Sequence, residues 1–125
     1  MACITTEQAM TLAHEWVSVW NRHDLEVILS HYAPDIEFSS PFIVKLLNKP
    51  DGTIRGIEAL RDYFSKGLAA YPALEFTLYH VLTGVSSIVL YYRSVNNLLA
   101  TEMMELDNTG KIKRVVAHYT ENLGL

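Results

Sequence analysis

Glu102 is the residue whose type and position most favour chemistry inside the folded chain. In a strand over 98–106, alternate side chains share a face, so Glu102 lies on the same side as Met104 and Leu106. Desolvation disfavours an ionised carboxylate, so an inward Glu102 would have a raised pKa and keep a proton to donate. Two alternatives stay open. In the first, Glu102 points inward and pairs with a buried arginine. In the second, the strand register differs by one residue, which leaves the Glu102 side chain in solvent.

His118 is the second residue with acid-base potential. It lies near the end of the last expected strand, 111–119, and an imidazole titrates close to neutral pH. The other histidines show no metal-ligand spacing with one another or with acidic residues on one face, so no metal site is predicted. These residues, expected at the surface or at caps, are His14, His23, His31 and His80.

The composition predicts one globular domain over residues 1–125. Half of the 125 residues are hydrophobic and 19% are charged, which is ordinary for a folded chain of this length. The net charge of -4 comes from scattered acids, and no run of Lys or Arg forms the basic stripe that phosphate backbones require. Nucleic acid is therefore not an expected partner.

Residues 1–6 lack the basic flank and the apolar run of a signal peptide, and no later stretch is long enough to span a membrane. We therefore expect a cytoplasmic protein without a membrane partner. Cys3 is the only cysteine, so an internal disulfide is excluded, and its place near the terminus disfavours a catalytic thiol.

Helical spacing predicts three helices. Thr5 and Gln8 fit a capping box for a helix over 7–22. Its expected inner stripe is Met10, Ala13, Trp16, Val17 and Trp20. A short second helix begins after Asp24, carries Leu25, Ile28, Leu29 and Tyr32 on one face, and stops at Pro34. A third follows Gly56 and ends before Pro72.

Alternation predicts a half-buried strand over 36–40, ended by Pro41, and then a long loop with an apolar tip over 42–55. Four further strand-like runs separated by turn residues form an antiparallel meander: 74–82, 87–95, 98–106 and 111–119. The expected fold class is α+β, with three helices packed on one face of a curved antiparallel sheet.

Three segments carry a resemblance to a known family: WNRHDLEVILSHYAPDIEFSSP, RGIEALRDYFSKGL and MMELDNTGKIKRVVAHY. The chain resembles the nuclear transport factor two-like superfamily from Thr6 to Tyr119. More closely, it is similar to its SnoaL-like polyketide cyclase and ketosteroid isomerase branch. The resemblance implies a cystatin-like cone in which helices and sheet enclose an apolar pocket.

The family's catalytic positions can be compared with this chain one at a time. The base that precedes a proline at the end of the first strand falls on Ser40, and the donor tyrosine of the first helix falls on Trp16. The donor aspartate falls on Glu102. A serine hydroxyl cannot abstract an α-proton without a stronger base, and an indole donates only one hydrogen bond. We therefore expect no steroid isomerisation by the known mechanism.

The resemblance also indicates which side chains face the pocket. On the last strand, Val115, Ala117 and Tyr119 match pocket-facing positions, which puts His118 on the opposite face, at a dimer surface, with a catalytic role as the alternative. Expected substrate contacts are Trp16, Trp20, Tyr32, Phe38, Ser40, Phe64, Met104, Ala117 and Tyr119.

An aromatic set has two interpretations, a plain core or the wall of a cavity for a flat apolar ligand. It comprises Trp16, Trp20, Phe38, Tyr63, Tyr91 and Tyr119. Residues 42–44 and 46–47 form either a lid over that cavity or a patch buried against a partner subunit.

Three functional hypotheses follow. The first is an isomerase, lyase or cyclase that needs no cofactor and works by acid-base chemistry on an apolar, carbonyl-containing substrate, with Glu102 as its main group. The second is a non-catalytic pocket for an apolar ligand, favoured by the absence of a base at Ser40. The third is a dimerisation domain. Strand runs that are apolar on both faces, such as 88–92, predict a homodimer through the outer face of the sheet.

Overall fold

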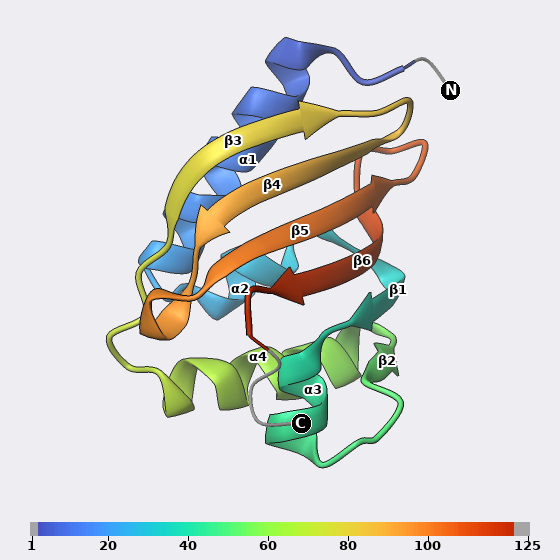
Figure 1. Ribbon diagram of the computed structural model, residues 1–125. Helices are drawn as coiled ribbons and strands as arrows, with labels where there is room; N and C mark the ends of the chain where they lie inside the picture. The colour runs from blue at the N-terminus through green and yellow to red at the C-terminus, as the bar shows by residue number, and fades with distance from the viewer. Residues whose placement is uncertain (1–2, 122–125) are drawn as a thin grey trace.

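A six-stranded curved sheet in the order β2-β1-β6-β5-β4-β3 forms the frame of the structure (Figure 1). The structure is a computed structural model, and it describes residues 3–121. The predicted antiparallel meander is confirmed. Its strands are β3 (Thr77–Thr83), β4 (Ser87–Arg93), β5 (Leu99–Leu106) and β6 (Ile112–Tyr119).

The first strand does not follow the antiparallel pattern. Strand β1 (Tyr32–Ser39) runs parallel to β6, whereas the short β2 (Thr53–Arg55) pairs with β1 in the antiparallel sense. A parallel pair requires a long crossover connection, and everything between β1 and β6 supplies it here. The expectation of a wholly antiparallel sheet is therefore wrong at this one pair.

Helices cover one face of the sheet, which confirms the α+β cone (Figure 1). The long helix α1 (Thr6–Asn21) packs against β3, and α4 (Ile57–Ala70) packs against β1. Two shorter helices, α2 (Leu25–Leu29) and α3 (Pro41–Leu47), complete the layer, so the described residues form four α-helices instead of three. No described helix is long and apolar enough to cross a membrane.

Helix α1 begins at the predicted capping box. The Gln8 amide donates to the Thr5 hydroxyl at 3.0 Å, and the Thr5 amide donates to the Gln8 side chain at 2.9 Å. The buried stripe of the helix is Ala9, Ala13, Trp16, Val19 and Trp20. Met10, expected inside, is exposed and Val17 is only half-buried, because the helix rotates Ala9 towards the sheet in place of Met10.

The second helix is shorter than predicted. Asp24 caps it as expected, accepting from the Val27 amide at 3.3 Å, but the helix ends at Leu29. Tyr32 is the first residue of β1 instead of the last of the helix, and Pro34 lies within that strand. The β1–β6 pairing shifts register between Tyr32 and Glu37, and a proline fits such an irregularity because it has no amide hydrogen to donate.

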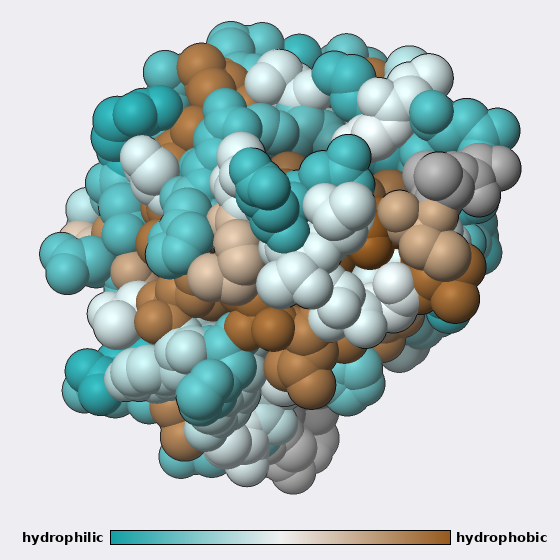
Figure 2. Space-filling model, turned by 90° about the horizontal axis from the view of Figure 1, so that it is seen from above, coloured by the Kyte–Doolittle hydropathy of each residue, from teal (hydrophilic) through white to brown (hydrophobic). Residues whose placement is uncertain are grey.

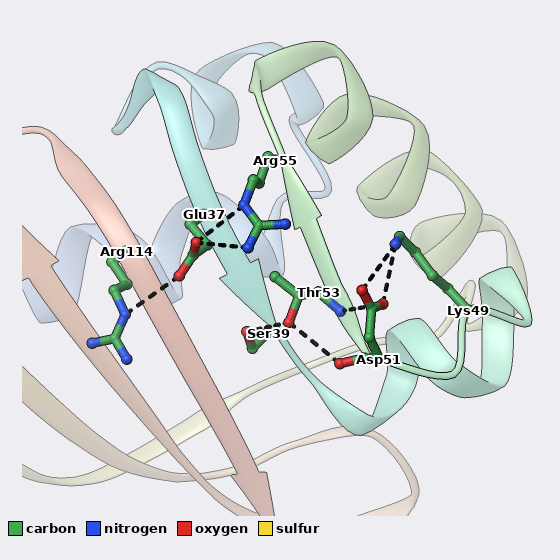
Figure 3. A network of polar contacts seen from close by, with 7 residues as sticks. All are labelled: Glu37, Ser39, Lys49, Asp51, Thr53, Arg55 and Arg114. Atoms are coloured by element: carbon green, nitrogen blue, oxygen red, sulfur yellow. Dashed lines mark hydrogen bonds and ion pairs between the residues drawn. The ribbon is translucent and has the colours of Figure 1, made fainter.

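The expected loop over 42–55 is wrong at both ends, where α3 and β2 (Thr53–Arg55) form, and only residues 48–52 lie outside regular elements. Ser40 is the N-cap of α3, its hydroxyl accepting from the Phe42 amide at 3.1 Å, and Pro41 occupies the first turn. The helix stops at Asn48, whose φ of 52° is left-handed. The chain then turns at Asp51, which accepts from the Thr53 amide at 3.3 Å, and enters β2 (Figure 3).

Two polar residues at the end of α1 fix the connection between α4 and β3. The Asn21 carboxamide donates to the Phe76 carbonyl at 2.9 Å and accepts from the Phe76 amide at 2.7 Å. The ring of His23 lies 2.7 Å from the Leu74 carbonyl, so its Nε2 carries the hydrogen that it donates. The position of Leu74 and Phe76 is therefore set by polar contacts as well as by packing.

We expect Asn21→Ala to lower the free energy of unfolding by about 1–3 kcal/mol, because the two hydrogen bonds between the Asn21 side chain and the Phe76 backbone are lost. Urea denaturation measures the change. Asn108→Ala is the matched control, since Asn108 is an exposed turn residue for which the described residues provide no side-chain hydrogen bond. Equal stability of the two variants would contradict a stabilising role for the Asn21 contacts.

Candidate active site

A cavity of about 60 Å³ lies between the helices and the inner face of the sheet. Its walls are largely aromatic. The helices contribute Trp16, Trp20, Phe42, Tyr63, Phe64 and Gly67, together with Leu46. The sheet contributes Phe38, Tyr92, Glu102 and Tyr119, and the connections beside it contribute Tyr71, Leu74, Phe76, Ser94 and Val95. Among these lining residues, Glu102 is the only carboxyl, and none is a lysine, an arginine or a histidine.

Glu102 points into this cavity from β5 and is 3% exposed. The Tyr92 hydroxyl donates to its Oε1 at 2.9 Å. Burial raises the pKa of Glu102 from its usual 4.5 to about 7, and the Tyr92 hydrogen bond opposes that rise only in part. Within residues 3–121 no basic side chain forms an ion pair with Glu102, so the inward orientation is confirmed and the alternatives of an arginine pair or a solvated register are wrong.

Four tyrosines surround this carboxyl, the buried Tyr32, Tyr63 and Tyr92 and the half-buried Tyr119. Burial raises the pKa of each phenol, and the negative charge of ionised Glu102 raises it further. Their hydroxyls therefore stay protonated at neutral pH. The cavity offers hydrogen-bond donors to an oxygen atom and no cation to balance an anion.

Ser40 is 4% exposed but is not part of the cavity wall. Its hydroxyl accepts from the Phe42 amide, and the Tyr63 hydroxyl lies 3.4 Å away. The Tyr119 hydroxyl also approaches the Ser40 and Tyr92 hydroxyls, and these contacts act against the rise of its pKa, although neither has full hydrogen-bond geometry. Ser40 therefore caps α3 and contacts the hydroxyl groups of two lining residues, Tyr63 and Tyr119.

The two tryptophans differ in what they can offer a ligand. The Trp16 indole donates to the Tyr32 hydroxyl at 3.0 Å, so the expected pocket donor is already used within the core. The Trp20 indole nitrogen is buried without a hydrogen bond of full geometry, but it lies beside the same Tyr32 hydroxyl and acts against the rise of the Tyr32 pKa. Its N–H is therefore held in the core less firmly than that of Trp16.

The structure brings together most of the predicted site. Trp16, Trp20, Phe38, Phe64 and Tyr119 line the cavity with Glu102, as predicted. Four expected substrate contacts are buried but lie behind the wall instead of in it: Tyr32, Ser40, Met104 and Ala117. They are corrected to buried residues of the surrounding core, because none of them lines the cavity.

Two residues considered for the site lie on the outer face of the sheet. His118 is exposed and pairs with Thr101 there, as strand parity predicted, so the alternative of a catalytic role at Glu102 is wrong. Tyr91 also faces outwards, where its ring stacks on that of His80 at 6.1 Å. Strand alternation explains both results, and it makes Tyr92 the tyrosine that faces the cavity.

Sequence reasoning missed several residues that line the cavity. Tyr92 lies in β4 and could have been found, since it shares strand parity with the buried Ile88 and Leu90. Ser94 and Val95 had no such signal. They lie where β4 leaves the sheet for a short 3-10 turn (Val95–Asn97), and Asn96 is left-handed there with a φ of 55°.

No group of three His, Cys, Asp or Glu side chains gathers at metal-binding distances in the described part of the chain. Cys3 is a free, exposed cysteine far from the carboxyl in the sequence and outside the cavity wall. The chemistry available to the cavity is therefore that of one carboxyl, the phenols, the Ser94 hydroxyl and the indole rings.

A family model described as the SnoaL-like domain matches residues 13–120. The chain belongs to the SnoaL-like family. A crystal structure of a SnoaL-like protein of unknown function from Burkholderia thailandensis is 37% identical, with a TM-score of 0.92 over 95% of this chain and 99% of that one. No curated protein matches the chain significantly.

Two structures of much lower sequence identity share the fold. The epoxide hydrolase/cyclase-like enzyme SalBIII, of pyran ring formation in the polyether salinomycin, is 16% identical, with a TM-score of 0.72 over 90% of this chain and 91% of that one. A candidate ketosteroid isomerase from Kribbella flavida is 18% identical, with a TM-score of 0.68 over 93% and 80%. At these identities the likeness shows a shared fold.

The buried carboxyl predicts a pH-dependent stability. Because the pKa of Glu102 is raised on folding from 4.5 to about 7, the folded state keeps a proton that the unfolded state releases in this window. We expect the free energy of unfolding to fall by about 3 kcal/mol between pH 4.5 and 7 through this group.

Urea denaturation at a series of pH values measures this loss. Glu102→Gln should remove it, because the amide keeps an oxygen for the Tyr92 hydroxyl but does not titrate. Glu105→Gln, on the same strand but facing the other side, is the matched control and should keep the dependence. If the free energy of unfolding of Glu102→Gln still fell by the same amount between pH 4.5 and 7, the pH dependence could not be assigned to Glu102.

Proposed function

We propose that this chain is an isomerase, lyase or cyclase that acts by general acid-base chemistry on a small, neutral, carbonyl-containing molecule. The carrying observation is a single carboxyl with a pKa of about 7, buried in an aromatic cavity and surrounded by protonated phenols. A group that titrates near the working pH is present in both forms, so it can give up a proton and take one back.

The cavity supports a simple proton-transfer scheme. The Glu102 carboxylate removes a proton from the carbon next to a carbonyl group, and returning it to another carbon or oxygen regenerates the enzyme. The carbonyl oxygen, on which negative charge develops, accepts a hydrogen bond from a phenol in the wall. The Tyr92 hydroxyl already donates to Glu102, which leaves the Tyr119 hydroxyl for this role. Transferring one proton within the bound molecule gives an isomer, and loss of a leaving group from the same enolate gives a lyase reaction.

Steroid isomerisation is not part of this proposal. Ser40 has replaced the expected base, and it is occupied as a helix cap. The Trp16 indole is bonded to Tyr32 and does not act as a pocket donor. An engineered protein cavity needs about 150 Å³ to hold benzene. The 60 Å³ seen here is far too small for a steroid.

Glu102→Gln tests the catalytic proposal. A thermal-shift screen of neutral ketones, enones and lactones first finds molecules that raise the melting temperature, and turnover of those hits is then followed by NMR. We expect Glu102→Gln to lower kcat by about 10²- to 10⁴-fold while changing ligand affinity little. Glu105→Gln should be as active as the unchanged protein.

The same screen separates catalysis from simple binding. Hits that bind in the cavity but are not converted by the unchanged protein would favour the second hypothesis, a ligand-binding module without a base. Full kcat in Glu102→Gln would exclude the proposed role of this carboxyl.

We also propose that the chain forms a homodimer through the outer face of its sheet. An apolar row crosses four strands in register, formed by Leu82, Val89, Met103 and Val116. Leu82 is 57% exposed, so this row is open at its β3 end. Figure 2, which views the molecule from above relative to Figure 1, shows hydrophobic surface interrupted by polar residues.

A charged row borders the apolar one and limits where a partner can lie. Glu37 pairs with Arg55 at 3.1 Å and with Arg114 at 3.5 Å (Figure 3), and Arg114 also pairs with Glu105 at 3.5 Å. These ion pairs neutralise the charged side chains on β1, β2, β5 and β6. The apolar end of the row, near β3 and β4, is therefore the surface that we expect a second copy to cover. A second copy presents the same row, and a two-fold axis would bring the two rows together.

Leu82→Glu tests the dimer. We expect it to give a monomer at micromolar concentration in sedimentation equilibrium, whereas the unchanged protein sediments as a dimer, because a charge in the apolar row is left desolvated. Met10→Glu makes the same charge change at an exposed residue of α1 and should stay dimeric. A monomeric unchanged protein would refute the proposal.

A further inference from the structure

A second hollow, of about 530 Å³, lies directly outside the cavity. It opens between the α4–β3 connection and the hairpin that joins β4 to β5. Four residues line both spaces: Tyr71, Leu74, Ser94 and Val95. The cavity that holds Glu102 and this outer hollow are therefore neighbours separated by one layer of side chains.

The size of the inner cavity limits what can reach Glu102. Since about 150 Å³ is needed for one benzene ring, 60 Å³ admits only a fragment of a few heavy atoms. A larger ligand with one end at the carboxyl must place the rest of itself elsewhere. The outer hollow has the room, and it begins where the inner cavity ends.

The backbone on both sides of the shared residues is held by hydrogen bonds. On one side, His23 holds the Leu74 carbonyl at 2.7 Å. On the other, the Ser94 amide donates to the Leu98 carbonyl at 2.7 Å, and the Leu98 amide donates to the Val95 carbonyl at 3.1 Å. The width of the passage between the two spaces therefore depends on side-chain rotation and not on movement of a backbone flap.

The outer hollow has a different chemistry from the cavity. Asn96 and Asn97 lie on its rim with left-handed φ values of 55° and 59°, and both side chains are exposed. Carboxamides donate and accept hydrogen bonds, which suits hydroxyl groups because they do both as well. Glu75 and Arg93 supply one charge of each sign, so the hollow has no net preference for an ionic ligand.

We infer that the ligand is an elongated, uncharged molecule whose small carbonyl-bearing end enters the cavity and whose hydroxylated tail lies along Asn96 and Asn97 in the outer hollow. This inference rests on the proposed function of the Glu102 cavity. It adds a second subsite to that cavity. The expected ligand is then an elongated molecule that spans both spaces, not a compact flat one.

Three ketones test the inference by NMR. Butanone represents the carbonyl end alone, methyl hexyl ketone adds an apolar tail, and the terminal hydroxyl derivative of methyl hexyl ketone adds the polar group. All three should shift the indole signals of Trp16 and Trp20. Only the hydroxyl derivative should shift the side-chain amide signals of Asn96 and Asn97, and it should bind about fivefold more tightly than methyl hexyl ketone, as expected for one added hydrogen bond.

Replacing both Asn96 and Asn97 with Gly removes the carboxamides and keeps a residue type suited to left-handed backbone. This variant should lose the preference for the hydroxyl derivative and keep the affinity for butanone. Asn48→Gly is the matched control, since Asn48 has the same backbone conformation with a φ of 52° and lines neither space.

The outcomes are distinguishable. Indole shifts without amide shifts, or a hydroxyl preference that survives loss of both carboxamides, would overturn the second subsite and leave the cavity proposal standing. Absence of indole shifts with every ketone would overturn the cavity proposal and the subsite together.

Discussion

The desolvation of one carboxyl is the constraint on which the candidate site depends. Glu102 is enclosed by aromatic side chains, and the Tyr92 hydroxyl is its one hydrogen-bond donor among the described residues. A buried ionised carboxylate without a cation is costly, so the fold keeps a group that is more stable when protonated. Such a group reduces stability at neutral pH, and its retention in the core is easier to understand as a functional feature than as a packing feature.

The sheet separates two kinds of surface through the alternation of its strands. On β5, Glu102 and Met104 face the helices while Thr101 and Met103 face outwards. The same alternation puts Tyr92 inside and Tyr91 outside on β4. A single sheet can therefore carry a reactive cavity on one face and an interface on the other, and changes on one face need not disturb the second.

The fold tolerates large differences in sequence. Structures only 16% and 18% identical have a similar architecture, and in this chain the position expected for a base is a capping serine. The cone requires apolar side chains of suitable size, and many sequences meet that requirement. The reaction depends on a few polar groups inside it, which can change without loss of the fold.

The sequence by itself determined the main elements and the orientation of Glu102. The capping box of α1, the four-strand meander and the parity of β5 are local patterns, and each was confirmed because the backbone imposes a fixed period on its side chains. The resemblance to the family supplied the cone and the order of its parts.

Only the tertiary structure decided what surrounds the carboxyl. The parallel pairing of β1 with β6 and the helix at Pro41–Leu47 depend on contacts between segments far apart in the chain. The same holds for the Asn21 contact with Phe76, fifty-five residues away. Local periodicity contains no information on such contacts, because they arise when separate elements pack together and satisfy one another's buried polar groups.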